Sequence, residues 1–317
     1  GCVIEMAKRH HSRYGSMQFW PRKRAKRIYP RTRSWPGLDG TKLLGFAGYK
    51  AGMTQVSIRD NTNSMTKGQI ISMPATIIEC PPLKPLSLRF YQQDDYGFKV
   101  IAEIPTEQQL EKELSRKIRL PKKNNGKIIP EGFDRATLQV YTQPKFTPIK
   151  KKPEIFEIEI TNPTNDFLKN ILANKEIKIK DVFREGQFID VQAVTKGKGF
   201  QGPVKRFGIS LRKKKSEKTK RGPGSLGAWK AQQHTMYRIA HAGQMGFHTR
   251  TDYNKLLLKI SSKPAEINPK SGFHKYGILK TDYILLKGSV SGPKKRLIRL
   301  REPIRSKSKP ITIEMQQ

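Results

Sequence analysis

Residues 188–208 read FIDVQAVTKGKGFQGPVKRFG, and the character of the chain changes halfway through this stretch. Phe188 to Thr195 is a short, mostly apolar run that predicts a β-strand. From Lys196 onward glycine alternates with lysine, and glycine lets the backbone approach a polyphosphate closely because it has no Cβ atom. We therefore expect a strand that leads directly into a long basic loop.

The basic stretch continues as far as Arg250. Between Thr195 and Arg250 the chain carries fourteen Lys or Arg and a single acid, Glu217. Such a segment has no apolar face from which to build a core, and its cations attract polyanions. We expect a nucleic acid to order this loop.

The charge of the whole chain also indicates a polyanionic partner. It has 63 Lys+Arg against 26 Asp+Glu, a net +37 over 317 residues, and phosphates relieve the self-repulsion of such a body. No apolar run approaches the length that spans a bilayer, and no basic amphipathic helix has a broad apolar face, so we expect no membrane partner. The two cysteines, Cys2 and Cys80, form no metal knuckle, which fits a reducing, intracellular setting.

Residues 1–40 are predicted to form an extended basic arm. From Met6 to Leu38 there are ten Lys or Arg and no acid, and five aromatic rings interleave with them, at positions 14, 19, 20, 29 and 35. Prolines at 21, 30 and 36 oppose helix formation. The cations suit phosphates and the rings suit stacking on unpaired bases. The alternative is a disordered, solvated basic tail.

Residues 94–185 are far less basic, with 18 Lys or Arg against 15 acids. We expect an α+β insertion that faces solvent, away from any phosphate surface. Apolar residues at every fourth position predict a helix over Thr106–Ile118, and Asn165–Asn174 predicts a second. Alternating patterns predict strands over Thr137–Thr142 and Glu154–Ile160.

The segments that flank this insertion contain short apolar or alternating runs bounded by Gly and Pro, which are typical of a small barrel. These runs are Leu43–Met53, Ala75–Glu79, Leu86–Phe90, Phe188–Thr195, Tyr283–Lys287 and Arg296–Leu300. The predicted fold class is mainly β with an α+β insertion. The predicted segments are the N-terminal arm 1–40, a first barrel part 41–93, the insertion 94–185, a second barrel part 186–303 that includes the basic loop 196–250, and a basic C-terminal tail 304–317.

Two patterns in the basic loop suggest cofactor or metal sites, but their context argues against both. Gly197–Gly202 matches G-x-G-x-x-G, yet Pro203 and a polybasic run follow, where a dinucleotide site needs a helix and then an acid. His234, His241 and His248 are seven apart, with no cysteine or acid cluster beside them, unlike a zinc site. We expect no cofactor, no metal, no small-molecule substrate and no catalytic residue, because acids are nearly absent from the basic regions.

Several motifs together resemble the universal large-subunit ribosomal protein L-three family, in its archaeal and eukaryotic form. They are SMQFWPRKR at 16–24, GFAGYKAGMT at 45–54, VTKGKGFQG at 194–202, GSLGAW at 224–229, GQMG at 243–246, RT at 250–251 and LKGSVSGPKKR at 286–296. One such motif would carry little weight, whereas several in the family order are highly specific.

The resemblance implies a six-stranded, elongation-factor-like barrel with long extensions, the arm and the central loop, that run through large-subunit ribosomal RNA. It implies a cytoplasmic, non-catalytic protein of the ribosome that supports subunit assembly and neighbours a ribosomal protein of the L-fourteen family. Trp229 matches the family's loop-tip tryptophan, which approaches the peptidyl-transferase centre. Lys230-Ala231 departs from the family's usual proline after that tip. Residues 218–221 contain no histidine, so we expect no modified histidine there, and this departure and the short insertion favour an archaeal source.

The residues expected to contact RNA are cations, amides, aromatic rings and one glycine from the arm and the loop. They are Arg13, Phe19, Trp20, Arg22, Lys23, Arg24, Lys26 and Arg27 in the arm, and Lys196, Lys198, Gly199, Gln201, Lys205, Arg206, Arg212, Lys213, Lys214, Lys220, Arg221, Trp229, Gln244, His248 and Arg250 in the loop.

Two other functions remain as alternatives. An enzyme that modifies nucleic acid would need a carboxylate or histidine cluster beside the basic groove, and the sequence shows none. A chromatin-like protein that packs duplex DNA would bind random DNA as well as it binds RNA, which a competition assay would reveal.

Overall fold

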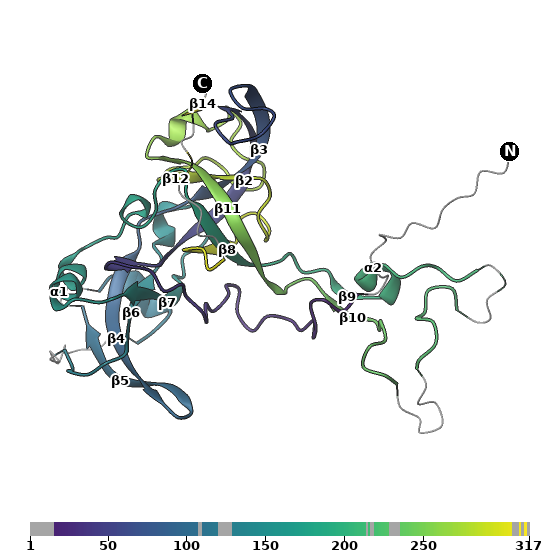
Figure 1. The fold of residues 1–317 in the computed structure, drawn as a ribbon, viewed down its shortest axis with the longest axis horizontal. Coiled ribbons are helices and arrows are strands. Elements are labelled where there is room, and N and C mark those ends of the chain that lie inside the picture. Colours follow the sequence, from purple (N-terminus) through teal and green to yellow (C-terminus); the bar gives the residue numbers. More distant parts are fainter. Residues whose placement is uncertain are drawn as a thin grey trace. The chain divides into compact units, whose positions relative to one another are not determined.

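Strands dominate the computed structural model, which describes residues 16–106, 110–119, 129–213, 215, 219–227, 235–305, 311 and, for the backbone alone, 314–315. The described residues form two compact units (Figure 1). Unit one contains residues 16–26 and Thr195–His248, and unit two contains Arg27–Val194 together with the residues from Thr249 onward. The fold is thus mainly β, as predicted.

Six strands of unit two pair in a closed ring. They are β2 (Gly45–Arg59), β3 (Ile70–Glu79), β8 (Phe188–Val194), β11 (Thr249–Ser261), β12 (Tyr283–Lys287) and β13 (Leu297–Arg301). The order is β13-β8-β11-β12-β3-β2, and β2 pairs back with β13, with every neighbouring pair antiparallel. The short strand β14 (Glu314–Met315) pairs with β2 at Ile58 and Arg59. Because the ring closes, these strands leave few unpaired edges.

Each ring strand contributes apolar side chains to the core. Examples that are almost completely buried are Phe46, Ile77, Val191, Leu257, Ile284 and Ile298. Burying a side chain of this size stabilises the fold by about 1.5–3 kcal/mol. Gly48 of β2 allows close packing, because a Cβ atom there would lie 2.7 Å from the carbonyl oxygen of Glu79.

A second, five-stranded antiparallel sheet also belongs to unit two. Its order is β1-β7-β6-β4-β5, formed by β1 (Lys42–Leu43), β7 (Ile155–Thr161), β6 (Arg135–Tyr141), β4 (Lys84–Asp94) and β5 (Gly97–Pro105). Residues alternate between its faces, so Leu88 and Leu138 are buried with Leu168 and Ile171 of helix α1 (Asn165–Ala173). The alternate positions carry polar side chains.

One strand predicted for the ring lies elsewhere, and one strand of the ring was missed. Leu86–Phe90 lies in β4, which pairs with β5 and β6 in the five-stranded sheet rather than in the ring. The sixth ring strand is β11, which we did not predict. Its pairing with β8 shifts register between Asp252 and Lys255, and Asn254 has a positive φ of 53°, so the bulge interrupts the alternation that marks a strand.

The predictions inside the insertion were mostly correct. Helix α1 and strands β6 and β7 lie where they were expected. The helix expected over Thr106–Ile118 is instead a short 3-10 helix, η1 (Lys112–Arg116), and residues 107–109 lie outside the described part of the chain. Within η1 only Leu114 is buried, and one apolar anchor does not stabilise a long helix.

The remaining helical segments are short. They are η2 (Pro144–Phe146), η3 (Ile179–Asp181), η5 (Pro264–Glu266) and α2 (Pro203–Phe207). No helix in the described part of the chain is long and apolar enough to cross a membrane.

Candidate nucleic-acid interface

The two ends of the basic loop pair with each other in unit one. Strand β9 (Gly199–Gln201) runs antiparallel to β10 (Gly243–Met245), with Phe200 opposite Gln244. Helix α2 follows β9 and ends at Gly208, whose φ of 69° is left-handed, as is common after a helix. The loop therefore has a folded base.

Gly246 permits a close crossing in this base. Its φ is 71°, and a Cβ atom there would lie 2.1 Å from the carbonyl oxygen of Lys196. Any other residue would have to move the backbone, so glycine is required here for packing. The glycine-rich sequence serves the fold of the loop as well as any ligand.

Arg206 holds the base of the loop together. Its buried guanidinium donates hydrogen bonds to the carbonyl oxygens of Gln244 at 3.0 Å, His241 at 2.9 Å and Arg22 at 3.4 Å. Burial lowers the pKa of Arg206, and the nearby charge of Arg22 lowers this pKa further. Arg206 was expected to contact RNA, and in this structure three of its five N–H donors bind backbone carbonyls.

Residues 16–26 of the arm pack on this base. The guanidinium of Arg22 lies 4.1 Å from the centre of the Phe207 ring and donates to the carbonyl oxygen of Arg206. The Trp20 ring lies 6.0 Å from the same phenylalanine. The amide of Ala25 donates to the carbonyl oxygen of Phe247 at 2.8 Å.

His248 completes the contact between arm and loop. Its Nδ1 lies 2.8 Å from the carbonyl oxygen of Lys23, and its side chain is buried. We expected the loop to need a nucleic acid for order. That expectation stays a prediction, but at the described base of the loop the arm supplies a packing surface that the loop sequence lacks.

Two amide side chains of the expected contact set also bind backbone. The amide of Gln201 donates to the carbonyl oxygen of Lys198 at 2.7 Å, and that of Gln244 donates to Gly246 at 2.9 Å. Further along the loop, Arg212 donates to the carbonyl oxygens of Pro223 and Gly224. These groups shape the loop, so the surface presented to a ligand comes mainly from other residues.

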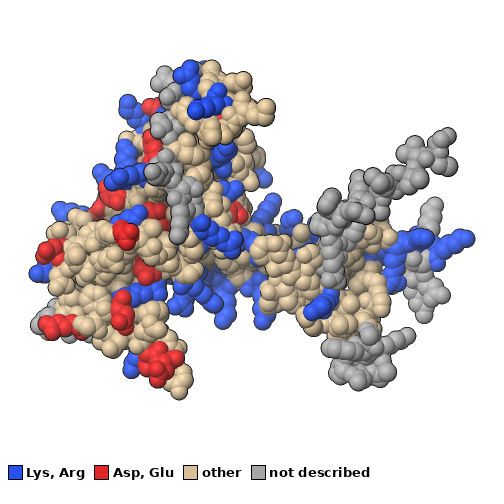
Figure 2. All heavy atoms as spheres, in the orientation of Figure 1, with Lys and Arg blue, Asp and Glu red and all other residues tan. Residues whose placement is uncertain are grey.

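Most of the remaining expected residues are exposed. Exposed in unit one are Phe19, Trp20, Lys23, Arg24, Lys26, Lys196, Lys198, Gly199, Lys205, Arg212, Lys213, Lys220 and Arg221. The described residues of unit one include no Asp or Glu, and Figure 2 shows basic but no acidic side chains on them. Arg13, Lys214 and Trp229 lie outside the described residues.

Arg27 and Arg250 belong to unit two, where the second half of the arm packs. Buried Tyr29 donates its hydroxyl hydrogen to the carbonyl oxygen of Ile155 at 2.7 Å. Arg301 donates to the carbonyl oxygen of Ser34 at 2.7 Å and forms an ion pair with Asp190 at 3.0 Å.

Arg299 also fixes the arm, by donating to the carbonyl oxygens of Pro30 and Glu157. Burial lowers the pKa of Arg299 to about 10. Sequence analysis missed Arg299 and Arg301 as arm-binding residues. The sequence feature that could have identified them is a pair of arginines inside an otherwise apolar strand, LIRLR at 297–301.

Comparison with known proteins finds one matching family and several relatives that share a single name. The family described as Ribosomal protein L3 matches residues 6–129 and 134–315. A large ribosomal subunit protein uL3 of Methanobrevibacter smithii is 45% identical, over 96% of this chain and 95% of the relative. The protein of the same name from Archaeoglobus fulgidus is 46% identical over 94% and 93%, and that from Methanosphaera stadtmanae is 44% identical over 97% and 96%.

Proposed function

The chain belongs to the ribosomal protein L3 family, and from this premise we propose that it is a structural, non-catalytic constituent of the large ribosomal subunit that binds large-subunit rRNA. The observation that carries the proposal is that unit one uses some polar side chains to hold its own backbone and leaves other cations exposed. Arg206, Gln244 and His248 build the base of the loop, while exposed cations surround it with no acid among the described residues. Such a surface attracts a polyanion.

The proposed mechanism combines charge neutralisation with shape. Lys196, Lys198 and Lys205 take phosphates, and the glycine beside them lets the RNA backbone come close. Trp20 is 41% exposed although it packs near Phe207, so part of its ring remains available for stacking on an unpaired base.

The finer features of the family remain proposals for this chain. We propose that the ring of six strands is the elongation-factor-like barrel, and that the segments are the arm 1–40, the barrel parts 41–93 and 186–303, the insertion 94–185 and the tail 304–317, except that β4 within 41–93 belongs to the sheet of the insertion. We further propose that the protein supports subunit assembly in the cytoplasm and neighbours a protein of the L-fourteen family. In this proposal Trp229 lies near the peptidyl-transferase centre, and the α1 side of the insertion faces solvent.

An rRNA-binding titration tests the proposal. Lys196→Gln/Lys198→Gln should reduce the slope of log affinity against log salt by about 1.4, because each phosphate neutralised contributes roughly 0.7. The control is Lys169→Gln/Lys175→Gln, which removes the same charge from exposed positions at α1. Equal effects of the two double variants would contradict a specific role for the loop.

A further inference from the structure

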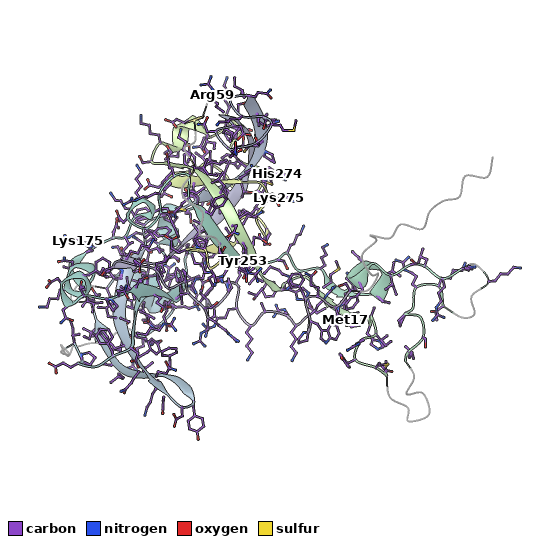
Figure 3. All side chains as sticks on the ribbon, viewed as in Figure 1. Met17, Arg59, Lys175, Tyr253, His274 and Lys275 are labelled. Atoms are coloured by element: carbon purple, nitrogen blue, oxygen red, sulfur yellow. The ribbon has the colours of Figure 1, made fainter. Side chains whose placement is uncertain are left out.

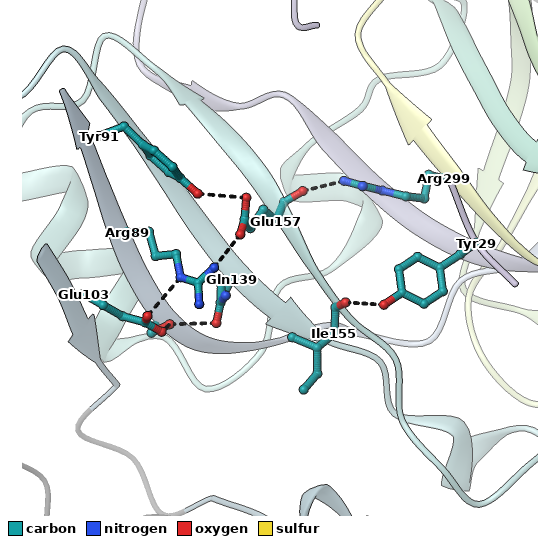
Figure 4. Close-up of polar contacts among 9 residues, drawn as sticks. Tyr29, Arg89, Tyr91, Glu103, Gln139, Ile155, Glu157 and Arg299 are labelled. Atoms are coloured by element: carbon teal, nitrogen blue, oxygen red, sulfur yellow. Dashed lines mark hydrogen bonds and ion pairs between the residues drawn. The ribbon is translucent and has the colours of Figure 1, made fainter. Parts of the chain in front are cut away.

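Unit two contains a cavity of about 650 Å³ between the arm and the five-stranded sheet. Arm residues 27–35 form one wall. The polar face of the sheet forms the floor, with Thr137 from β6. Figure 4 shows three further residues of the floor, Arg89 and Tyr91 from β4 and Glu157 from β7. A cavity of this size accommodates a ligand as large as a nucleotide.

The floor is held by a hydrogen-bonded network. Arg89 forms ion pairs with Glu103 at 2.9 Å and Glu157 at 2.7 Å, and the Tyr91 hydroxyl donates to Glu157 at 3.1 Å (Figure 4). The side-chain amide of Gln139 lies 3.0 Å from the Ser87 hydroxyl, which also contacts Glu103 at 2.6 Å. The floor is therefore pre-organised, and its charges are largely paired.

The wall carries positive charges that have no partner among the described residues. Arg27, Arg31 and Arg33 are exposed, and their side chains have no hydrogen bond or ion pair with any described residue. The backbone that presents them is fixed through Tyr29 on one side and the Arg301–Ser34 contact on the other. Of the residues that the structure describes, six arginines and a single acid, Glu157, line the cavity. This excess favours an anionic occupant.

Aromatic rings also line the cavity. Phe98 at the start of β5 is 51% exposed, although it lines the cavity together with Tyr91 and Trp35. The guanidinium of Arg135 lies 5.4 Å from the Phe98 ring centre and 5.9 Å from that of Tyr91. Cations next to accessible ring faces suit a ligand that carries both a phosphate and a planar base.

We propose that this cavity binds an unpaired RNA nucleotide, with a phosphate on Arg31 and Arg33 and the base stacked on Phe98. The inference rests on the proposed function and adds a second RNA site to it. It also revises the expectation that the whole insertion lies away from phosphate, because the polar face of its sheet would contact RNA. An acidic peptide would satisfy the arginines but would leave the ring faces unused.

The first test measures binding of a single-stranded uridine decamer to the full chain. Arg31→Gln/Arg33→Gln should lower the salt slope by about 1.4, at roughly 0.7 per phosphate. Lys169→Gln/Lys175→Gln is the matched control, since neither lysine lines the cavity and Lys175 is labelled at α1 in Figure 3. Phe98→Leu keeps an apolar side chain but removes the ring, and should weaken binding roughly fivefold or more. Unchanged melting temperatures confirm that each variant is folded.

The second test locates the RNA by ultraviolet crosslinking of the decamer and mass spectrometry of the peptides. We expect crosslinks in the peptide that holds Tyr91 and Phe98, lost in Phe98→Leu, and separate crosslinks in residues 196–213. Crosslinks confined to 196–213 would overturn the cavity site and leave the proposed function intact. A decamer that fails to bind at all would overturn the cavity site, whereas the proposed function fails only if the rRNA titration described above also shows no binding. A glutamate decamer that displaces RNA from Phe98 with equal affinity would assign the cavity to an acidic protein and overturn the inference.

Discussion

The guanidinium of Arg206 lies within hydrogen-bonding distance of three carbonyl oxygens, from His241, Gln244 and Arg22. Arg206→Lys keeps the charge but cannot reach all three acceptors, because an ammonium lacks the planar fork of a guanidinium. Each buried acceptor left without a donor costs about 1–3 kcal/mol. We expect faster amide hydrogen exchange throughout β9 and β10, with the ring of unit two unaffected.

The control for Arg206 is its neighbour. Lys205→Gln changes an exposed cation in the same helix and should leave amide exchange as it is in the unaltered chain. If Arg206→Lys exchanged no faster than Lys205→Gln, the structural role given to Arg206 would be wrong.

Asp60 offers a test by pH. Its carboxylate accepts hydrogen bonds from the hydroxyls of Thr62, Ser64 and Thr66 and from the amide of Thr62. The hydroxyl bonds, that of Ser64 most of all, hold the pKa of Asp60 far below its usual value. Because the folded-state pKa is depressed, the stabilisation of this loop is fully present above about pH 4 and is lost as the pH falls below it.

Proteolysis of the loop between β2 and β3 measures this effect. We expect cleavage near Met65 by an acid-active protease to increase as the pH falls below 4. Asp60→Asn should be cleaved readily at every pH, since its amide nitrogen cannot accept the hydroxyl bonds. A cleavage rate in the unaltered chain that does not depend on pH would rule out this role for Asp60.

The roles of single residues were only partly predictable. Charge and glycine content identified the basic loop, because those properties belong to the sequence itself. The sequence did not show that Arg206 and His248 point inward while Lys205 points outward. That distinction depends on which backbone carbonyls lie near each side chain, and the carbonyls of residues 22 and 23 belong to the N-terminal arm, far from residue 206 in the sequence.

Among the elements, the arm depends on contacts with β7 and β13. Tyr29→Phe removes the hydroxyl that donates to Ile155 and leaves that carbonyl without its partner, which should cost about 1–3 kcal/mol. Chemical denaturation measured by tryptophan fluorescence should show the loss, because Trp35 lies in the same part of the arm. Tyr96→Phe is the control, since Tyr96 is fully exposed. Equal denaturation midpoints for the two variants would show that the arm does not depend on this contact.

Elements with clear periodicity were predicted well. The spacing of Leu168 and Ile171 identified α1, and the alternation in β6 and β7 identified both strands. The ring was harder, because β4 and β11 have similar apolar runs and only long-range pairing assigns β4 to the other sheet. The bulge in β11 at Asp252–Lys255 interrupts the alternating pattern, so the sequence did not reveal this strand of the ring.

At the scale of the whole molecule, charge is divided between the parts. The described residues of unit one contain no acid, whereas Figure 2 shows acidic side chains gathered over the sheet and helix of the insertion. A net charge of +37 favours a polyanionic partner, because bound phosphates relieve the repulsion among the cations. The base of the loop is nevertheless folded by its own contacts, so we expect RNA to bind a frame that already exists.

Lysine acetylation, compared between intact large subunits and the free chain, tests this account most directly. The account predicts that Lys196, Lys198, Lys205 and Lys213 react readily in the free chain and are protected in the subunit. Lys169 and Lys175 should react equally in both. Loop lysines that remain fully reactive in the subunit, or protection at α1 in their place, would contradict it.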